Sequence, residues 1–266
     1  MDMKLNGKKA IVSGAANGIG EATVLALLSE GAVVAGLDID RKGLDELATS
    51  SKNLPGKLHT WKVDFTDADQ ITNTLDSCLE VLDGIDLLIN NVGSGAVRTF
   101  EQLTDTDWQK TIDLNFMSYV RTIRHVLPSL RRSDSGVIIN NASDLARQPE
   151  ALPVDYSTTK AAILALTKAL ARAEGPTIRV NAVAPGPIWS KFWTKPGGFA
   201  DTYADLYQMD PKAAVEHEMK QRQLPLGRLG TPEEVANIIV FLCSDASSFV
   251  TGSLWGVDGG SVRGLI

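Results

Sequence analysis

The sequence is poor in cysteine and has no long apolar run. Two cysteines occur among 266 residues, Cys78 and Cys243, in separate apolar-periodic segments. We expect core thiols rather than a disulfide or a metal pair, which is consistent with a reducing cytoplasm and no bound metal. No stretch reaches the roughly 18–20 apolar residues that span a bilayer. No apolar run follows a basic start at the N-terminus, so we expect neither a signal peptide nor a membrane partner.

Aromatic residues are also scarce, at 6% of the chain, although 44% of its residues are hydrophobic. Aliphatic side chains must therefore fill most of the core, which suits a parallel sheet buried on both faces. The net charge of −6 gives no electrostatic reason to bind nucleic acid or an anionic membrane. The length fits a single α/β domain that can bury a large core.

Short apolar runs alternate with longer helical patterns along the chain. We expect strands at 8–13, 32–37, 57–63, 85–89, 136–140, 178–184 and 253–257, and helices at 18–30, 42–51, 67–82, 106–131, 155–174 and 231–243. This alternation predicts a doubly wound, Rossmann-type α/β fold, with a parallel sheet and helices on both faces. The Pro/Gly/aromatic stretch after the sixth strand is too long for a simple connection, so residues 187–226 are expected to form a substrate lid.

A glycine-rich turn follows the first expected strand. Gly14, Gly18 and Gly20 have the spacing G-x-x-x-G-x-G, with Asn17 and Ile19 among them. Glycines let the backbone turn tightly and approach a pyrophosphate, and the next helix offers its N-terminal N–H groups to phosphate. The motif predicts a dinucleotide site, and the alternative is a purely structural turn.

Carboxylates end the next two expected strands. Asp38 would accept hydrogen bonds from both hydroxyls of an adenine ribose and would repel a 2′-phosphate, so NAD is favoured over NADP. Arg41 and Lys42 follow closely and would weaken that discrimination. Asp64 ends the third strand, where it would face the adenine ring. For Asp38 and Asp64 the alternative is a helix N-cap.

Ser143, Tyr156 and Lys160 follow the fifth expected strand in that order. The spacing of Tyr156 and Lys160 puts them on one helix face, where an ammonium should lower the tyrosine pKa from its usual value of about 10. Ser143 would orient a substrate oxygen, and Asn115 is an amide at a helical position that favours an apolar residue. The alternatives are a solvated helix face, a loop hydroxyl and a buried amide that kinks its helix.

Together with later motifs, these residues resemble the short-chain dehydrogenase/reductase family over nearly the whole chain. The resemblance rests on Gly14-x-x-x-Gly18-Ile19-Gly20, Asp64, Asn90-Asn91-Val92-Gly93, Asn115, Ser143, Tyr156-x-x-x-Lys160, Pro185-Gly186 and the segments from Leu226 and Thr251. It implies a catalytic tetrad of Asn115, Ser143, Tyr156 and Lys160, a seven-stranded sheet and, usually, a homotetramer. Implied cofactor contacts are Gly14, Asn17, Gly18, Ile19, Gly20, Asp38, Asp64, Phe65, Asn91, Gly93, Tyr156, Lys160, Pro185, Gly186, Ile188 and Ser190.

The expected lid holds a large share of the aromatic residues, namely Trp189, Phe192, Trp193, Phe199, Tyr203 and Tyr207, together with Met209. They indicate either an apolar lid over a bulky or ring-containing substrate, or packing against the same domain or a neighbouring subunit. Arg98, Arg147 and Glu150 lie on loops at the same end. They indicate either an anionic substrate or simply solvated charges.

We therefore predict a cytoplasmic, NAD(H)-dependent oxidoreductase that interconverts a secondary alcohol and a ketone, with Tyr156 exchanging the proton. Its expected partners are a small-molecule substrate and further copies of the chain. The alternatives are a non-catalytic dinucleotide sensor or scaffold, an NADP-dependent 3-oxoacyl-thioester reductase, and a dehydratase or epimerase of the same fold.

Overall fold

A seven-stranded parallel sheet with the order β3-β2-β1-β4-β5-β6-β7 forms the centre of the molecule. The computed structural model describes residues 3–194 and 196–264. The strands are β1 (Lys9–Ser13), β2 (Val33–Asp38), β3 (Lys57–Lys62), β4 (Leu87–Asn90), β5 (Gly136–Asn141), β6 (Ile178–Pro185) and β7 (Leu254–Val257). The prediction of a doubly wound, Rossmann-type sheet is confirmed.

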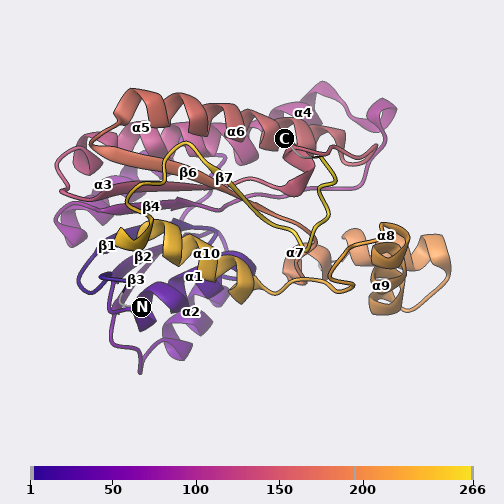
Figure 1. Ribbon diagram of the computed structural model, residues 1–266, viewed down its shortest axis with the longest axis horizontal. Helices are drawn as coiled ribbons and strands as arrows, with labels where there is room; N and C mark the ends of the chain where they lie inside the picture. Colours follow the sequence, from indigo (N-terminus) through magenta and orange to yellow (C-terminus); the bar gives the residue numbers. More distant parts are fainter. Residues whose placement is uncertain (1–2, 195, 265–266) are drawn as a thin grey trace.

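Helices cover both faces of the sheet (Figure 1). One face carries α1 (Gly18–Ser29), α2 (Arg41–Ser50) and α10 (Pro232–Cys243), and the other carries α3 (Ala68–Leu82), α5 (Ser118–Leu130) and α6 (Val154–Glu174). Successive strand residues point to opposite faces. In β1, Ala10 and Val12 join the core under α1 and α10, while Ile11 joins the core under α3 and α5. Both faces are therefore aliphatic, as the composition predicts.

The helical pattern expected at 106–131 is confirmed in extent, but a π-helical turn interrupts its regular register. The chain forms α4 (Asp105–Ile112), then a π-helical turn, η2 (Asp113–Met117), and only then α5. Asn115 lies in this turn, where its Oδ1 accepts from the Ser94 N–H at 2.9 Å and its Nδ2 donates to the Ser94 carbonyl at 2.8 Å. A π turn changes the helical register locally. Here it coincides with the tertiary hydrogen bonds of Asn115.

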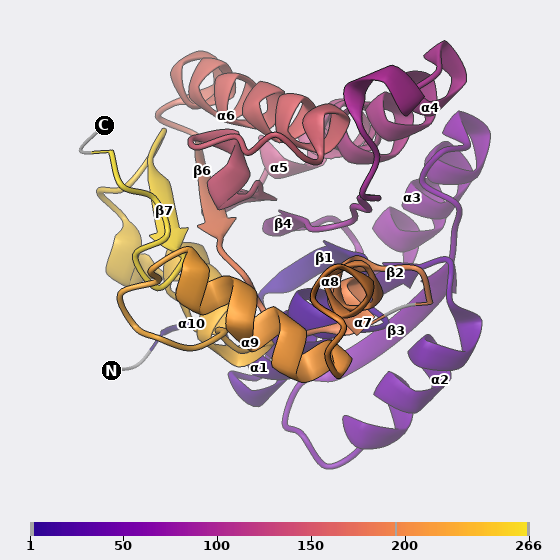
Figure 2. The same ribbon diagram turned by 90° about the vertical axis from the view of Figure 1, so that its right-hand side faces the viewer.

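Residues 187–226 hold three helices, α7 (Lys191–Thr194), α8 (Phe199–Tyr207) and α9 (Pro211–Gln221), set apart from the sheet at one end (Figures 1 and 2). Phe199, Val215 and Met219 belong to a small hydrophobic cluster of their own. The remaining elements are short 3₁₀ turns: η1 (Phe100–Gln102), η3 (Asp144–Ala146) and η4 (Asp245–Ser247). No helix in the described ranges is long and apolar enough to cross a membrane. Cys78 and Cys243 are free and buried, so the expectation of core thiols is confirmed.

Candidate active site

A cavity of about 520 Å³ lies where the carboxyl ends of the strands meet the segment that contains α7 and α8. Its lining joins the glycine turn after β1 to the segments after β2, β3, β4, β5 and β6. Every cofactor contact implied by the resemblance lines this cavity except Gly20, and every tetrad residue lines it except Asn115. Residues separated by up to 208 positions, from Gly14 to Arg222, thus share one space.

The glycine turn needs its glycines for backbone geometry and for space. Gly14 and Gly18 have positive φ angles of 67° and 57°, a region that favours glycine. A Cβ on Gly20 would lie 1.8 Å from the Gly14 carbonyl oxygen, so Gly20 allows α1 to pack against the turn. A Cβ on Gly18 would lie 3.3 Å from the Cβ of Ser190. The turn is therefore open to the cavity at the first residues of α1, which fits a pyrophosphate.

Asp38 is 8% exposed and lies on the cavity wall at the end of β2. Its Oδ2 accepts from the N–H of Ala16 at 3.0 Å, and its Oδ1 accepts from the N–H of Asp40 at 2.9 Å. The N-cap of α2 is Asp40, whose Oδ1 accepts from the Gly43 N–H at 3.1 Å. The alternative that Asp38 caps this helix is therefore wrong.

The cations that follow Asp38 are paired with carboxylates of α2. Arg41 lies 2.8 Å from Asp45, and Lys42 lies 3.6 Å from Glu46. Both cations are thus engaged along the helix.

Asp64 also lines the cavity and does not cap a helix. Its Oδ1 accepts from the N–H and the hydroxyl of Thr66, at 2.8 and 2.7 Å. The N-cap of α3 is Asp67, which accepts from the N–H groups of Asp69 and Gln70. The cap alternative for Asp64 is therefore wrong as well.

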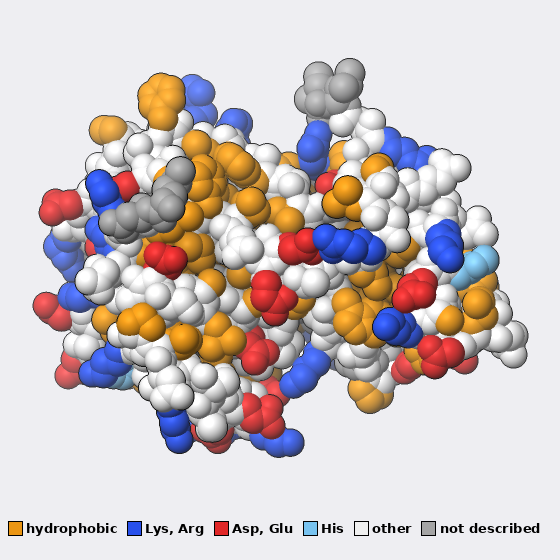
Figure 3. All heavy atoms as spheres, turned by 60° about the horizontal axis from the view of Figure 1, so that its bottom comes forward, with side chains coloured by type: hydrophobic (Ala, Val, Ile, Leu, Met, Phe, Trp, Pro, Cys, Tyr) orange, Lys and Arg blue, Asp and Glu red, His pale blue; other side chains and the backbone are white. Residues whose placement is uncertain are grey.

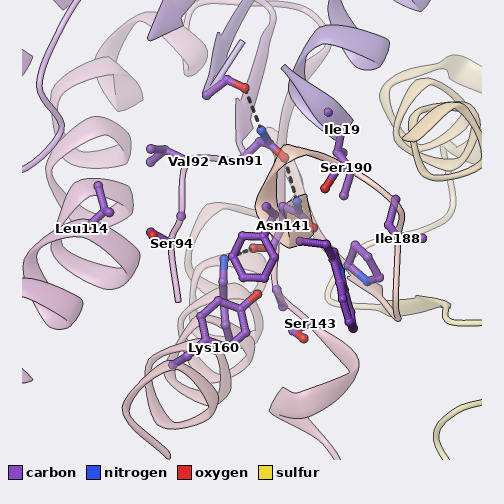
Figure 4. A pocket seen from close by; sticks show the side chains of 18 of the residues that line it. Ile19, Asn91, Val92, Ser94, Leu114, Asn141, Ser143, Lys160, Ile188 and Ser190 are labelled. Atoms are coloured by element: carbon purple, nitrogen blue, oxygen red, sulfur yellow. Dashed lines mark hydrogen bonds between the residues drawn. The ribbon is translucent and has the colours of Figure 1, made fainter. Parts of the chain in front are cut away.

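Asn91 connects the glycine turn to the end of β5 (Figure 4). Its Nδ2 donates to the carbonyl oxygens of Ser13 and Gly14, at 3.2 and 3.1 Å, and its Oδ1 accepts from Nδ2 of Asn141 at 2.7 Å. Lys160 donates to the Asn141 carbonyl at 2.7 Å. Asn141 was missed by the sequence analysis. Two asparagines at the end of an apolar strand were the available signal.

Lys160 lies inside the protein. It is 2% exposed, its Nζ also donates to the Tyr119 hydroxyl at 3.3 Å, and burial lowers its pKa to about 7. Tyr156 is half-buried on the same side of α6, with its ring centroid 5.7 Å from the lysine Nζ. The interpretation of this pair as a solvated helix face is therefore wrong.

The pKa of Tyr156 is raised, contrary to our expectation that Lys160 would lower it. Burial is the main cause and the charge of Asp144 adds to it, while a hydrogen bond with Ser143 opposes them. The Lys160 ammonium is directed to the Asn141 carbonyl rather than to the phenol oxygen. Lys160 is not among the causes of this shift, and the loss of hydration sets its direction.

Asn115 lies behind the cavity and is fully buried. Its two hydrogen bonds to the backbone of Ser94 hold the segment after β4 in place. Next to Ser94, a Cβ on Gly93 would lie 3.3 Å from the Lys160 Nζ and 3.4 Å from the Asn115 Oδ1. The side chain is thus a buried, satisfied amide in a distorted helix, one of the alternatives expected for it.

Ser143 is 6% exposed at the start of η3. Its Oγ accepts from the Leu145 N–H at 3.2 Å and donates to Oδ1 of Asp144 at 3.0 Å. It therefore caps a turn, as the loop-hydroxyl alternative expects, and also faces the cavity beside Tyr156. Asp144 lines the cavity as well and was missed by the sequence analysis.

Lid aromatics form one wall of the cavity, contributed by Phe192, Trp193, Phe199 and Tyr203. The ring centroids of Phe192 and Tyr156 are 5.9 Å apart, so the segment expected to be a lid contacts the catalytic candidate directly. The other predicted lid residues, Trp189, Tyr207 and Met209, are not part of the lining.

Among the charged loop residues, Arg98 forms ion pairs with Asp107 and, at 3.6 Å, with Asp155. Arg147 and Glu150 are exposed. None of these predicted loop charges belongs to the cavity lining. The lining instead includes Arg222, which the sequence analysis missed and which is paired with Glu218 at 2.7 Å.

Comparison with known proteins identifies relatives over almost the full chain. Residues 14–262 match the family model described as enoyl-(acyl carrier protein) reductase. The chain is 36% identical to the 3-oxoacyl-[acyl-carrier-protein] reductase FabG of Thermotoga maritima, over 98% of this chain and 100% of the relative.

Solved structures agree with these matches. The L-sorbose reductase of Gluconobacter frateurii, complexed with NADPH and L-sorbose, is 33% identical, with a TM-score of 0.93 and 100% coverage of both chains. A short-chain dehydrogenase/reductase of Brucella melitensis, a glucose/ribitol dehydrogenase, is 33% identical, with a TM-score of 0.87 and coverage of 99% and 100%. With its cavity, glycine turn and sheet order, the chain belongs to the short-chain dehydrogenase/reductase family, as an oxidoreductase acting on an alcohol or ketone with a nicotinamide dinucleotide.

Proposed function

We propose that this protein interconverts a bulky or ring-containing secondary alcohol and its ketone with NAD(H), and that Tyr156 exchanges the proton on the substrate oxygen. The observation that carries the proposal is the meeting of Ser143, Tyr156 and Lys160 in the cavity that also holds the glycine turn. A sensor or scaffold would need only the glycine turn to bind a dinucleotide. The buried Lys160 and the neighbouring hydroxyls of Ser143 and Tyr156 therefore favour an enzyme.

The residues present fit the cofactor. The backbone of the glycine turn would hold the pyrophosphate, Asp38 the adenine ribose, and Lys160 the nicotinamide ribose. Asp64 and Phe65 would border the adenine, while Asn91 and Gly93 would border the nicotinamide half. The loop formed by Pro185, Gly186, Ile188 and Ser190 would hold the nicotinamide itself. When bound, NAD accepts the hydride and NADH supplies it.

The protein side chains manage the proton. Tyr156 remains protonated at neutral pH because its pKa is raised, and it can donate to a ketone oxygen in the reductive direction. Ser143 lies beside it and orients the substrate oxygen. Lys160, with a pKa lowered to about 7, can exchange a proton near neutral pH. Asn115 fixes the segment beside Lys160, so its role is to position this group.

NAD is the proposed cofactor because of the carboxylate at the end of β2. Asp38 is nearly buried on the cavity wall, where a 2′-phosphate would bring two negative charges together. Arg41 and Lys42, which would otherwise attract such a phosphate, are paired with Asp45 and Glu46. The sorbose reductase relative is complexed with NADPH, so cofactor choice needs a direct measurement.

The substrate proposal rests on residues 187–226 acting as a lid. Four aromatic side chains of this segment line the cavity, and Phe192 contacts Tyr156. Leu145 and Leu152 also line the cavity and give a further apolar surface. A ring or a bulky aliphatic group fits such walls better than a small polar substrate.

The test is a screen of ketones and secondary alcohols followed at the NADH absorbance, with Tyr156→Phe as the key variant. We expect this variant to lose kcat by about 10²–10⁴-fold, the usual contribution of a general acid–base, while NADH still binds. Tyr207→Phe, outside the cavity lining, is the matched control and should keep full activity. Full activity of Tyr156→Phe on a true substrate would contradict the proposal.

A 3-oxoacyl-thioester reductase is the second candidate, favoured by the 36% identity to the Thermotoga maritima FabG. The same screen separates the two functions if it includes acetoacetyl-coenzyme A with NADH and with NADPH. Turnover of the thioester alone, with NADPH preferred, would replace the first proposal by the second. Turnover without a net change in NADH absorbance would instead indicate dehydration or epimerisation.

We also propose a cytoplasmic homo-oligomer, with a tetramer favoured. Ala161, Ala165 and Ala169 are exposed at successive turns of α6, a helix face that suits close packing against another chain. Phe249 is fully exposed, and Figure 3, which turns α1 and α10 toward the viewer, shows hydrophobic side chains on that face. Light scattering coupled to gel filtration should give four chains per particle. A monomer at micromolar concentration would contradict this proposal.

A further inference from the structure

Asp144 is a nearly buried carboxylate next to the proposed catalytic serine. It is 9% exposed and lines the cavity. Its partners in the described structure are the hydroxyls of Ser143 and Ser261 and the backbone N–H of Leu145. A buried charge is costly unless hydrogen bonds offset it. Three donors converge on this one, which indicates a site built to hold the carboxylate.

The hydrogen bonds of Ser143 determine what it can offer to a ligand. A hydroxyl has one proton and two lone pairs. Ser143 Oγ donates its proton to Oδ1 of Asp144 at 3.0 Å and uses one lone pair to accept from the Leu145 N–H at 3.2 Å. The remaining lone pair serves the hydrogen bond that Ser143 also forms with Tyr156. While Asp144 is ionised, Ser143 therefore has no proton left to donate, and it can accept a hydrogen bond from a ligand once the Tyr156 hydroxyl turns to that ligand.

The second oxygen of Asp144 is held by the segment after β7. Ser261 Oγ donates to Oδ2 of Asp144 at 2.6 Å. Ser261 also interacts with Asp258 at 3.4 Å, and its carbonyl accepts from Nε2 of Gln148 at 3.2 Å. The loop that carries Ser143 is thus tied to a segment more than 110 positions later in the chain.

We propose that Asp144 is a positioning residue for the reaction: it holds the Ser143 hydroxyl as a hydrogen-bond acceptor, so that the cavity binds an alcohol in preference to the matching ketone, and Ser261 holds Asp144. This inference rests on the proposed function. The charge of Asp144 also acts on Tyr156, whose pKa it helps to raise. One side chain therefore influences both hydroxyls at the reacting oxygen.

The preference follows from the number of protons available. With Tyr156 protonated, an alcohol can accept from the phenol and donate its own proton to Ser143. A ketone oxygen has no proton, so Ser143 must release Asp144 before it can donate to the ketone. That exchange removes a hydrogen bond from a charged group, and such bonds are stronger than those between neutral groups.

The test compares Asp144→Asn with Glu150→Gln, a control that removes one negative charge from the exposed part of the same loop. The Asn side chain keeps the shape of Asp, and its oxygen can still accept from the Leu145 N–H. Because that oxygen is neutral, it holds the Ser143 proton less strongly than the carboxylate does, and Ser143 can release this proton to a ketone more readily. The probes are cyclohexanol in the presence of NADH and cyclohexanone in the presence of NAD. Neither combination can turn over, so ligand-observed NMR measures binding alone.

We expect Asp144→Asn to shift the ratio of the two dissociation constants toward the ketone by about tenfold, and Glu150→Gln to leave it unchanged. Ser261→Ala should shift the ratio in the same direction, and Ser261→Thr should restore it. A thermal unfolding curve for each variant confirms that it is folded. An unchanged ratio in folded Asp144→Asn overturns the inference, as does a wild-type cavity that binds neither probe. Absence of turnover in the screen would instead count against the proposed function alone.

Discussion

Asp38→Asn is the substitution that most directly tests cofactor choice. The carboxylate is nearly buried on the cavity wall and accepts hydrogen bonds from the N–H groups of Ala16 and Asp40. An amide of the same shape removes the negative charge. It also leaves one of the two N–H groups facing an NH₂ group, so we expect a loss of stability of about 1–3 kcal/mol.

The change in cofactor preference follows from the charge that is removed. Two unit charges about 4 Å apart repel each other by about 4 kcal/mol near a protein surface, and salt reduces this value. A repulsion of ~2–4 kcal/mol corresponds to a factor of ~30–1000 in affinity. We therefore expect the wild type to bind NADH more tightly than NADPH by a factor in this range, and Asp38→Asn to lose most of the difference.

Titration of nicotinamide fluorescence with each cofactor measures these affinities without a substrate. Asp40→Asn is the matched control because Asp40 carries the same charge two positions later, caps α2 and is not part of the cavity lining. It should lower stability but leave the NADH to NADPH ratio within about threefold of the wild type. Our account of Asp38 is refuted if the wild type prefers NADPH, or if Asp38→Asn keeps the wild-type ratio.

Two further predictions concern the buried lysine and the lid. The pKa of Lys160 is about 7 in the folded chain and about 10.4 when unfolded. The unfolded state therefore binds more protons between these values, and the free energy of unfolding gains a contribution that rises with pH. The free energy of unfolding in urea should rise from pH 7 to pH 9 in the wild type but not in Lys160→Met. An equal rise in both proteins would exclude Lys160 as its cause. Phe192→Ala removes the ring 5.9 Å from Tyr156 and should raise KM by about tenfold, the effect of one lost apolar contact. Tyr207→Ala changes a residue outside the cavity lining and should leave KM unchanged. Equal effects of the two substitutions on KM would contradict the role of residues 187–226 as a lid.

The sheet and the cofactor turn could be predicted because their signals are local. Most strands are short apolar runs, with β3 (KLHTWK) as an exception, and the glycines of the turn lie within seven positions of one another. The π turn at Asn115 coincides with hydrogen bonds to Ser94, 21 positions earlier in the chain. Ser94 lies outside residues 106–131, so the apolar pattern within that range carries no sign of the contact. The pattern therefore predicted one regular helix.

The lid helices were partly accessible from local signals. Asp210 followed by Pro211 is a helix start, and both residues occupy the N-cap and first position of α9. The sequence analysis placed both residues in the expected lid without assigning a helix there, and so overlooked this signal. The partner of Asp144 could not be found in the same way, because Ser261 reaches it only after β7 has paired with β6.

Tyr156 illustrates why recognition of a pattern does not yield the electrostatics of a site. The i, i+4 spacing correctly places Lys160 near the tyrosine, but the effect of a charge depends on where the ammonium points and on how much water both groups lose. Here the Asn141 carbonyl accepts a hydrogen bond from Lys160, and burial raises the tyrosine pKa. The free cavity is therefore set for a protonated tyrosine beside an acceptor serine. We propose that this state binds an alcohol, because the Tyr156 phenol can donate to the alcohol oxygen while Ser143 accepts from it.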